Sequence, residues 1–110
     1  MQKIIQISLN DILADADGAA KRITSTCAHR SGPYRVSGIC QVGEMAYVVL
    51  LPAGSAGPAL AHRFVEIAEA TPDDVIALLN ERWSADFDCL GSVNTCDGLT
   101  LCLFAKTRNA

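Results

Sequence analysis

The chain has 110 residues, of which 50% are hydrophobic and 19% charged, and its formal net charge is −3. This length fits one domain, and this composition can bury a core and excludes a disordered chain. Aromatic residues make up 5% of the chain and no Lys/Arg run occurs, which argues against nucleic acid as a partner. No apolar run approaches the length of a membrane-spanning helix, and the N-terminus lacks the apolar core of a signal peptide. We therefore expect a cytoplasmic protein without a membrane partner.

The first predicted strand covers Lys3 to Leu9, where Ile residues partly alternate with polar ones. A helix follows, for which Asn10 or Asp11 can serve as the N-terminal cap. Apolar residues recur at helical spacing on one of its faces: Ile12, Ala16, Ala19, Ile23 and Cys27. Gly18 interrupts this pattern, and Ser31-Gly32-Pro33 predicts the end of the helix, because Gly suits the C-terminal cap and Pro cannot continue a helix.

A β-hairpin is predicted over Tyr34 to Leu51, with Gly43-Glu44 as its tight turn. In its first strand the period of two places alternate residues on one face. These residues are Tyr34, Val36, Gly38, Cys40 and Val42. The segment 52–61, with two Pro and two Gly among small residues, is a linker too short to separate independent domains.

The second half of the chain begins with a predicted strand from Arg63 to Ala68. Thr71-Pro72-Asp73-Asp74 then marks a helix start, because Thr caps, Pro fits the first helical position and the carboxylates favour the helix dipole. The apolar face of this helix is expected to consist of Val75, Ile76, Leu79 and Trp83. A second hairpin is predicted from Phe87 to Phe104, with Asp97-Gly98 in its turn.

The two halves match each other in residue class and alternation, although identities are few. The second hairpin lies 53 positions after the first, which also places Ile76 under Ile23, and the first strands match at an offset of 60. The pseudo-repeats are 1–52 and 61–106 within one domain, 1–110. The predicted fold is α+β: a tandem βαββ repeat that forms a mainly antiparallel, ferredoxin-like sheet with two helices on one face. Chance similarity between two amphipathic hairpins is the alternative to a duplication.

Both faces of the two returning strands are apolar, and this pattern suggests self-association. Two helices can cover only one side of a sheet, so a second apolar face must meet another copy, a ligand or the curled sheet itself. We expect homo-oligomers with sheets packed face to face. The candidate interface residues are Val48, Leu50, Leu99, Leu101 and Leu103. A sheet that closes its own barrel-like core is the alternative.

Few side chains suggest chemistry. The five cysteines, Cys27, Cys40, Cys89, Cys96 and Cys102, are odd in number and form no Cys-x-x-Cys pair, so we expect no disulfide framework and no zinc ribbon. Cys27 and His29 could supply two metal ligands, but the spacing implies no third, and we expect neither a metal nor a cofactor. A Cys–His nucleophilic pair stays open as an alternative. The polar groups that could converge in a pocket are Arg35, Cys40, Tyr47 and His62.

Two resemblances follow from these elements. The predicted order contains the ferredoxin-like βαββαβ core, and it resembles the dimeric α+β barrel proteins, which pair their sheet faces. The second half is similar to a small bacterial strand-helix-hairpin domain family of unknown function. The similarity lies in Arg63-Phe-Val-Glu-Ile, Leu79-Asn-Glu-Arg-Trp, Phe87-Asp-Cys-Leu-Gly-Ser-Val and Leu101-Cys-Leu-Phe-Ala-Lys. In that family a Gly-Trp-Glu-Leu-Val signature enters the hairpin, whereas Trp83 here lies earlier and follows no Gly. This family implies no activity.

The sequence therefore predicts a non-enzymatic, oligomeric binding or interaction module whose partner is a second copy of itself. An unidentified small molecule or protein ligand is a further partner that the sequence leaves open. One alternative is a small enzyme of the dimeric α+β barrel type, with a pocket between sheet and helices. The other is a thiol-based sensor, which would need an exposed cysteine of low pKa.

Overall fold

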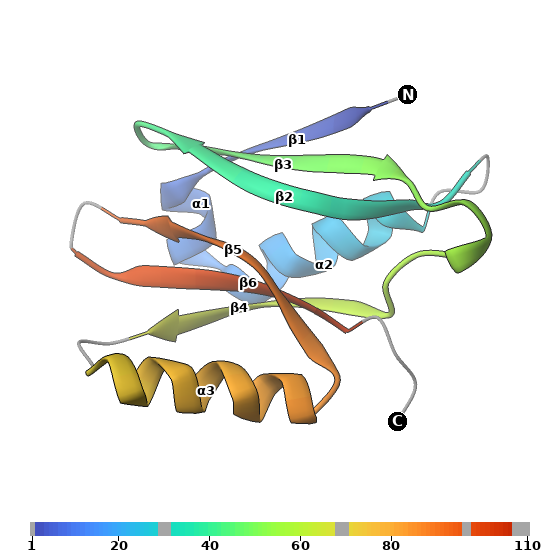
Figure 1. The fold of residues 1–110 in the computed structure, drawn as a ribbon. Coiled ribbons are helices and arrows are strands. Elements are labelled where there is room, and N and C mark those ends of the chain that lie inside the picture. The colour runs from blue at the N-terminus through green and yellow to red at the C-terminus, as the bar shows by residue number, and fades with distance from the viewer. Residues whose placement is uncertain (1, 29–31, 68–70, 96–97, 107–110) are drawn as a thin grey trace.

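The structure, a computed structural model, describes residues 2–28, 32–67, 71–95 and 98–106 (Figure 1). Its elements in chain order are β1 (Lys3–Ser8), α1 (Leu9–Ala14), α2 (Ala16–Cys27), β2 (Tyr34–Val42), β3 (Met45–Pro52), the 3₁₀ turn η1 (Gly54–Ala56), β4 (Ala61–Ile67), α3 (Pro72–Ser84), β5 (Phe87–Asn94) and β6 (Thr100–Lys106). The α+β class is confirmed. In the described part of the chain, no helix has the length and apolar character needed to cross a membrane.

The first half holds two helices where the sequence predicted one. Asp15 ends α1 and caps α2, because its side chain accepts a hydrogen bond from the Gly18 N–H at 2.9 Å. The predicted cap at Asn10 or Asp11 was wrong, since the Ser8 hydroxyl accepts from the Asp11 N–H at 3.1 Å. The predicted start of α3 is confirmed, because Thr71 and Asp74 form a reciprocal capping box with Pro72 at the first helical position.

The described strands form two antiparallel sheets of three strands each, in the orders β1-β3-β2 and β4-β6-β5. The single ferredoxin-like sheet predicted from the sequence was therefore wrong. Figure 1 shows the first sheet at the top, α1 and α2 beneath it, the second sheet next, and α3 at the bottom. The expectation of two helices on one face was also wrong, because α2 contacts β4 of the second sheet whereas α3 packs below that sheet, against β5.

The two sheets meet directly where β2 and β5 lie side by side. Both strands point the same way in Figure 1. Gly91 allows the close approach, because a Cβ there would stand 2.8 Å from the Ile39 Cγ2 atom. Away from this contact, α2 lies between the first sheet and β4.

A β-bulge occurs at the same place in both hairpins. The pairing of β2 with β3 shifts between Val36 and Gly38, and that of β5 with β6 shifts between Cys89 and Gly91, 53 positions later. The bulge corrects the predicted first face of β2. Val36 lies opposite the buried Leu50 and points inward. Gly38, Cys40 and Val42, which were predicted to share its face, lie beyond the bulge and opposite residues of β3 that point outward.

The second hairpin is one residue longer than the first around its turn. Ile39 pairs with Val48, but Ser92, 53 positions after Ile39, pairs with Cys102, 54 positions after Val48. The returning strands therefore correspond at an offset of 54 and not 53. The offset of 60 for the first strands agrees with the pairing, because Ile5 pairs with Val48 and Val65 with Cys102.

One hydrophobic core lies between the sheets and α2. Ile12 and Ile23 from the helices are fully buried in it, together with Val48 and Leu50 from the first sheet. The second sheet contributes Phe64, Val93, Leu101 and Leu103 to the same core. By contrast, α3 buries no residue completely, and Ile76, which the sequence matches with the fully buried Ile23, is 57% exposed.

Candidate functional site

The outer face of the first sheet is mostly apolar, with Gln6 opposite Tyr47 and Arg35 opposite Leu51 as polar residues on it, and no described helix covers it. We call this surface the open face; its residues are Ile4, Cys40, Val42, Tyr47, Val49 and Leu51. The strand register places them on one side, because Ile4 pairs with Val49 and Cys40 with Tyr47. Ile4 is 51% exposed, Val42 64% and Leu51 43%. Alternation along β3 explains the separation, since the other side of this strand supplies the core.

The corresponding face of the second sheet is closed. By the offsets of the strand pairing, the matching residues are Phe64, Val93, Thr95, Leu101, Leu103 and Ala105. All of them are buried. They face the first sheet and α2, so the first half of the chain covers this face. The same position in the two halves is therefore core in one and surface in the other.

The interface predicted from the sequence is corrected by these burials. Val48, Leu50 and Leu103 are completely buried, Leu101 is 7% exposed and Leu99 is half-buried. Val48, Leu50, Leu101 and Leu103 lie inside one chain, because they belong to its core cluster, and β6 carries five successive buried residues, Leu101–Ala105. A partner could reach them only if the core opened. The predicted alternative, a chain that closes its own core, describes their environment.

The four polar groups predicted to line a pocket do not converge. Cys40 and Tyr47 are cross-strand neighbours on the open face. Arg35 lies on the same face but at the other end of β2, opposite Leu51, and its Nε donates a hydrogen bond of 2.6 Å to the Gly57 carbonyl oxygen. His62 belongs to β4 in the other sheet. These residues therefore form no common site.

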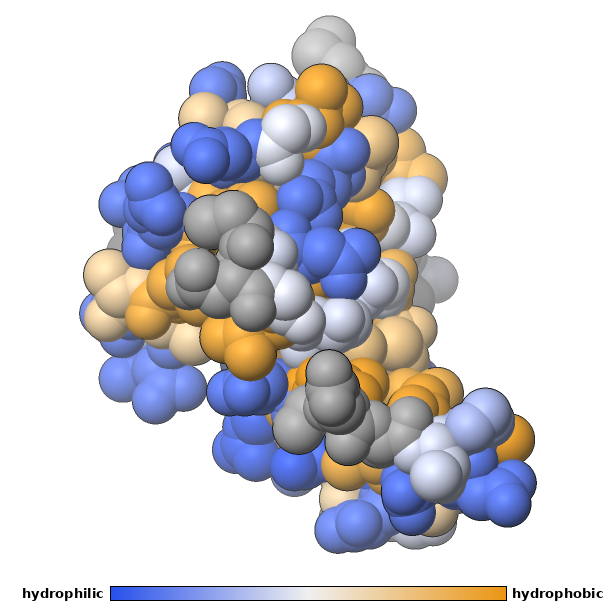
Figure 2. All heavy atoms as spheres, turned by 90° about the vertical axis from the view of Figure 1, so that its left-hand side faces the viewer, coloured by the Kyte–Doolittle hydropathy of each residue, from blue (hydrophilic) through white to orange (hydrophobic). Residues whose placement is uncertain are grey.

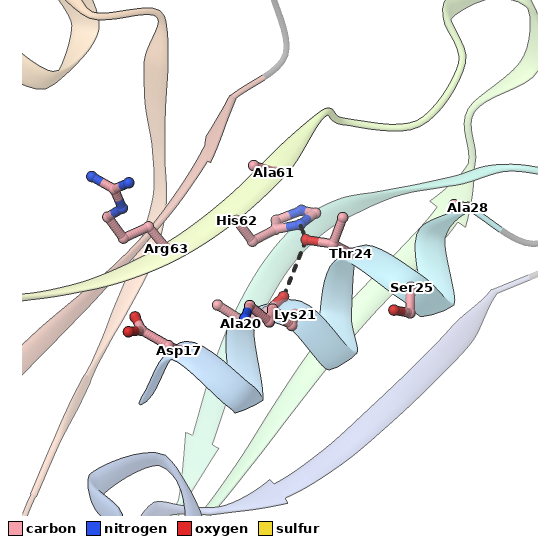
Figure 3. A pocket seen from close by; sticks show the side chains of 9 residues that line it. All are labelled: Asp17, Ala20, Lys21, Thr24, Ser25, Ala28, Ala61, His62 and Arg63. Atoms are coloured by element: carbon pink, nitrogen blue, oxygen red, sulfur yellow. Dashed lines mark hydrogen bonds between the residues drawn. The ribbon is translucent and has the colours of Figure 1, made fainter. Parts of the chain in front are cut away.

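His62 extends from β4 toward Thr24 of α2 and is 7% exposed (Figure 3). The Thr24 hydroxyl donates to the Ala20 carbonyl oxygen at 3.1 Å, and its oxygen lies 2.9 Å from His62 Nδ1. Since this hydroxyl has one hydrogen, both contacts are satisfied when Nδ1 carries the ring proton and donates it to Thr24. The Nε2 atom is then a buried acceptor, and no partner for it lies among the described residues.

A pocket of about 640 Å³ lies where α2 meets β4. Its lining includes Asp17, Lys21 and Thr24 from the helix and His62 and Arg63 from the strand (Figure 3). Burial lowers the pKa of His62 to about 4, so the ring is neutral at pH 7 and can accept a hydrogen bond. In the described part of the chain no carboxylate hydrogen-bonds this ring, so the pocket lacks the oriented acid–base pair of a hydrolytic site.

Of the four described cysteines, two are buried and two are exposed. Cys40 and Cys89 are exposed, whereas Cys27 and Cys102 are buried. Burial raises the pKa of Cys27, and burial together with the neighbouring Cys89 raises the pKa of Cys102 to about 11. Across residues 2–28, 32–67, 71–95 and 98–106, no three His, Cys, Asp or Glu side chains cluster to hold a metal ion. Cys96 and the candidate ligand His29 lie outside these ranges.

Sequence reasoning missed the open face as a surface. The signal was present, because Val49 and Leu51 alternate with core residues along β3 and Ile4 alternates with them along β1. Packing between distant segments decides which of the two alternating sets of residues faces the helices. The chain matches no protein-family model, no curated protein and no solved structure.

Proposed function

We propose that the protein is a self-associating interaction module and that the open face is its docking surface for a second copy. One observation carries this proposal: the face that is exposed in the first sheet is buried in the second. Ile4 corresponds to the buried Phe64, and Val49 corresponds to the fully buried Leu103. The chain thus already contains a surface that covers this kind of sheet face. A second copy brings the same sheet and helix chemistry to the open face.

The energetic argument rests on the exposed apolar side chains. Full burial of an aliphatic side chain stabilises by about 1.5–3 kcal/mol. Ile4, Val42 and Leu51 have each already lost part of their exposure in the single chain, so each would add about 1 kcal/mol on docking. Tyr47 and Val49 are half-buried and extend the patch between them. An apolar patch that is exposed to solvent on an antiparallel sheet with an open edge favours association.

The equivalence of the two faces also supports a duplication of one βαββ unit. Both sheets place the third strand of the half between the first and second. Both carry a bulge at positions 53 residues apart, with a glycine, Gly38 or Gly91, directly after the shift. Two unrelated hairpins have no reason to share an irregularity at matched positions.

The test is molar mass in solution by light scattering across a dilution series, for the wild-type chain and two variants. Ile4→Asp places a charge on the open face, and Leu60→Asp places the same charge on an equally exposed residue, 51% in both cases, outside that face. We expect the wild type and Leu60→Asp to associate alike, and Ile4→Asp to be a monomer with the thermal unfolding curve that the wild type shows at dilutions where it is dissociated. A wild-type chain that is monomeric at every concentration would refute the proposed function.

A further inference from the structure

The layers of the chain follow one direction and leave two unlike ends. From top to bottom in Figure 1 they are the first sheet, α1 with α2, the second sheet, and α3. The upper end of this stack is the open face. The lower end is the outer side of α3. Within the chain, one side of α2 contacts β4, the edge strand of the second sheet. A helix at this position in the stack therefore packs against the sheet that follows it.

The outer side of α3 has no such sheet beneath it. Ile76 is 57% exposed and Trp83 is 59% exposed, and their spacing of seven residues places them on one side of the helix. The half-buried Leu79 lies on this same side, three residues after Ile76 and four before Trp83, whereas the half-buried Val75 and Leu78 lie toward the second sheet. In Figure 2, α3 forms a lobe at the bottom of the molecule with hydrophobic as well as hydrophilic residues on its surface.

We infer that copies of this chain assemble head to tail, with the outer side of α3 of one copy docked on the open face of the next. This inference rests on the proposed function and names the surface that covers the open face. The contact between copies would repeat a contact that already exists within one chain. There, α2 and the first sheet lie over the inner face of the second sheet. Between copies, α3 and the second sheet would lie over the open face.

The charges at the two surfaces agree with this arrangement. In the chain, α2 lies along β4; between copies, α3 would lie along β1, which is the free edge of the first sheet. Lys3 and Arg22 are exposed at this edge, and Asp11 lines the same groove. On α3, the exposed acidic residue on the side of Ile76 is Asp73, three positions before it. The docking side of the helix would therefore bring a negative charge to an edge with a basic majority, which orients the encounter more than it strengthens it.

The symmetry of the assembly follows from the two unlike surfaces. A contact between a helix on one copy and a sheet on the next is heterologous, so the assembly keeps one free helix and one free sheet face at its two ends until a ring closes. The face-to-face pairing of sheets predicted from the sequence would instead be self-complementary and would stop at a dimer. The two arrangements differ in which residues they need, because only the head-to-tail contact uses Ile76.

The experiment mixes two variants that are each defective in one surface. Ile4→Asp blocks the open face and leaves α3 intact, whereas Ile76→Glu blocks α3 and leaves the open face intact. We expect each variant alone to be a monomer and an equimolar mixture to form a one-to-one heterodimer that does not grow with concentration. Far-UV circular dichroism checks folding, and Ile4→Thr or Ile76→Gln replaces any variant that is unfolded.

Three outcomes separate the two proposals. Recovery of a heterodimer from two monomeric variants supports the head-to-tail contact. An Ile76→Glu variant that associates as strongly as wild type would overturn this contact while the open face stays a docking surface. A monomeric wild type would overturn the proposed function itself. Leu13→Asp, at an exposed apolar residue on α1, is the matched control and is expected to change nothing.

Discussion

The side-chain amide of Gln41 satisfies both backbone groups of Asn94. Its Nε2 donates to the Asn94 carbonyl oxygen and its Oε1 accepts from the Asn94 N–H, each at 2.7 Å. The amide thus takes the place of a neighbouring strand's backbone at the point where β2 and β5 meet. The two residues are 53 positions apart, so corresponding positions of the two halves bond to each other. This contact fixes how the second sheet is placed on the first.

Replacing Gln41 with Glu should destabilise the protein. A carboxylate can still accept from the Asn94 N–H, but it has no donor for the carbonyl oxygens of Asn94 and Gly43, which Nε2 now serves. We expect a loss of about 1–2 kcal/mol in the free energy of unfolding, measured with urea. Gln2→Glu, on an exposed residue that precedes β1, is the control. Equal effects of the two substitutions would contradict the role given to Gln41.

Gly91→Ala should destabilise the protein more than Gly38→Ala. Gly91 has a φ of +146°, and an added Cβ would stand 2.8 Å from Ile39 Cγ2. Gly38 follows the corresponding bulge in the other hairpin, where an added Cβ meets nothing within 4 Å. We expect a difference of about 1–3 kcal/mol in the free energy of unfolding. Similar thermal midpoints for the two variants would show that β5 does not approach Ile39 this closely.

The stability of the protein should fall as the pH is lowered from about 6.5 to about 4. Burial lowers the pKa of His62 in the folded state to about 4 from 6.5, so in this window the unfolded chain binds the extra proton. The contribution of the neutral ring is complete above pH 6.5 and is lost as the pH falls, with an upper limit of roughly 3 kcal/mol. His62→Phe should remove this part of the slope, seen in urea titrations at pH 7 and pH 4.5. A variant that keeps the wild-type slope would exclude His62 as its source.

Leu101→Asp tests whether Leu101 belongs to the core or to an interface on the surface. The sequence suggested Leu101 as an interface residue, but it is buried between β6 and the first sheet. A charge there should cost about 3–5 kcal/mol in the free energy of unfolding, through lost packing and an unpaired buried carboxylate. Ile4→Asp should leave the unfolding curve close to that of the wild type at dilutions where the wild type is dissociated. If Leu101→Asp folded as well as wild type and lost only association, the residue would lie at an interface after all.

Local chemistry explains what was predictable from the sequence. The strands, the Gly43-Glu44 turn and the Thr71 capping box depend on residues within a few positions of one another, and all of them occur in the structure. The break at Asp15 was less visible, because it arises where the backbone leaves the helical conformation at Asp15, whose side chain then accepts from the Gly18 N–H. A bulge is invisible to a strict period of two, so the predicted face of β2 combined residues from both sides.

The placement of the helices could not be read from the sequence. A second, exposed sheet face was expected from the sequence because one sheet with both helices on one side was assumed. In the structure, α2 serves two sheets at once, because Ala20 and Ile23 belong to the core while Thr24 reaches His62 on β4. This packing joins segments about 40 residues apart, beyond the range of periodicity. The surface that needs a partner is therefore Ile4 and its neighbours, and not Leu101.

Molar mass measured by light scattering on the wild-type chain, over a dilution series, tests the central claim most directly. The chain has a mass of 11.7 kDa. We expect masses at multiples of this value that rise with concentration, or one constant multiple if a ring closes. A mass of one chain at every concentration would contradict self-association through the open face. The exposed side chains of the open face would then have no second copy to cover them.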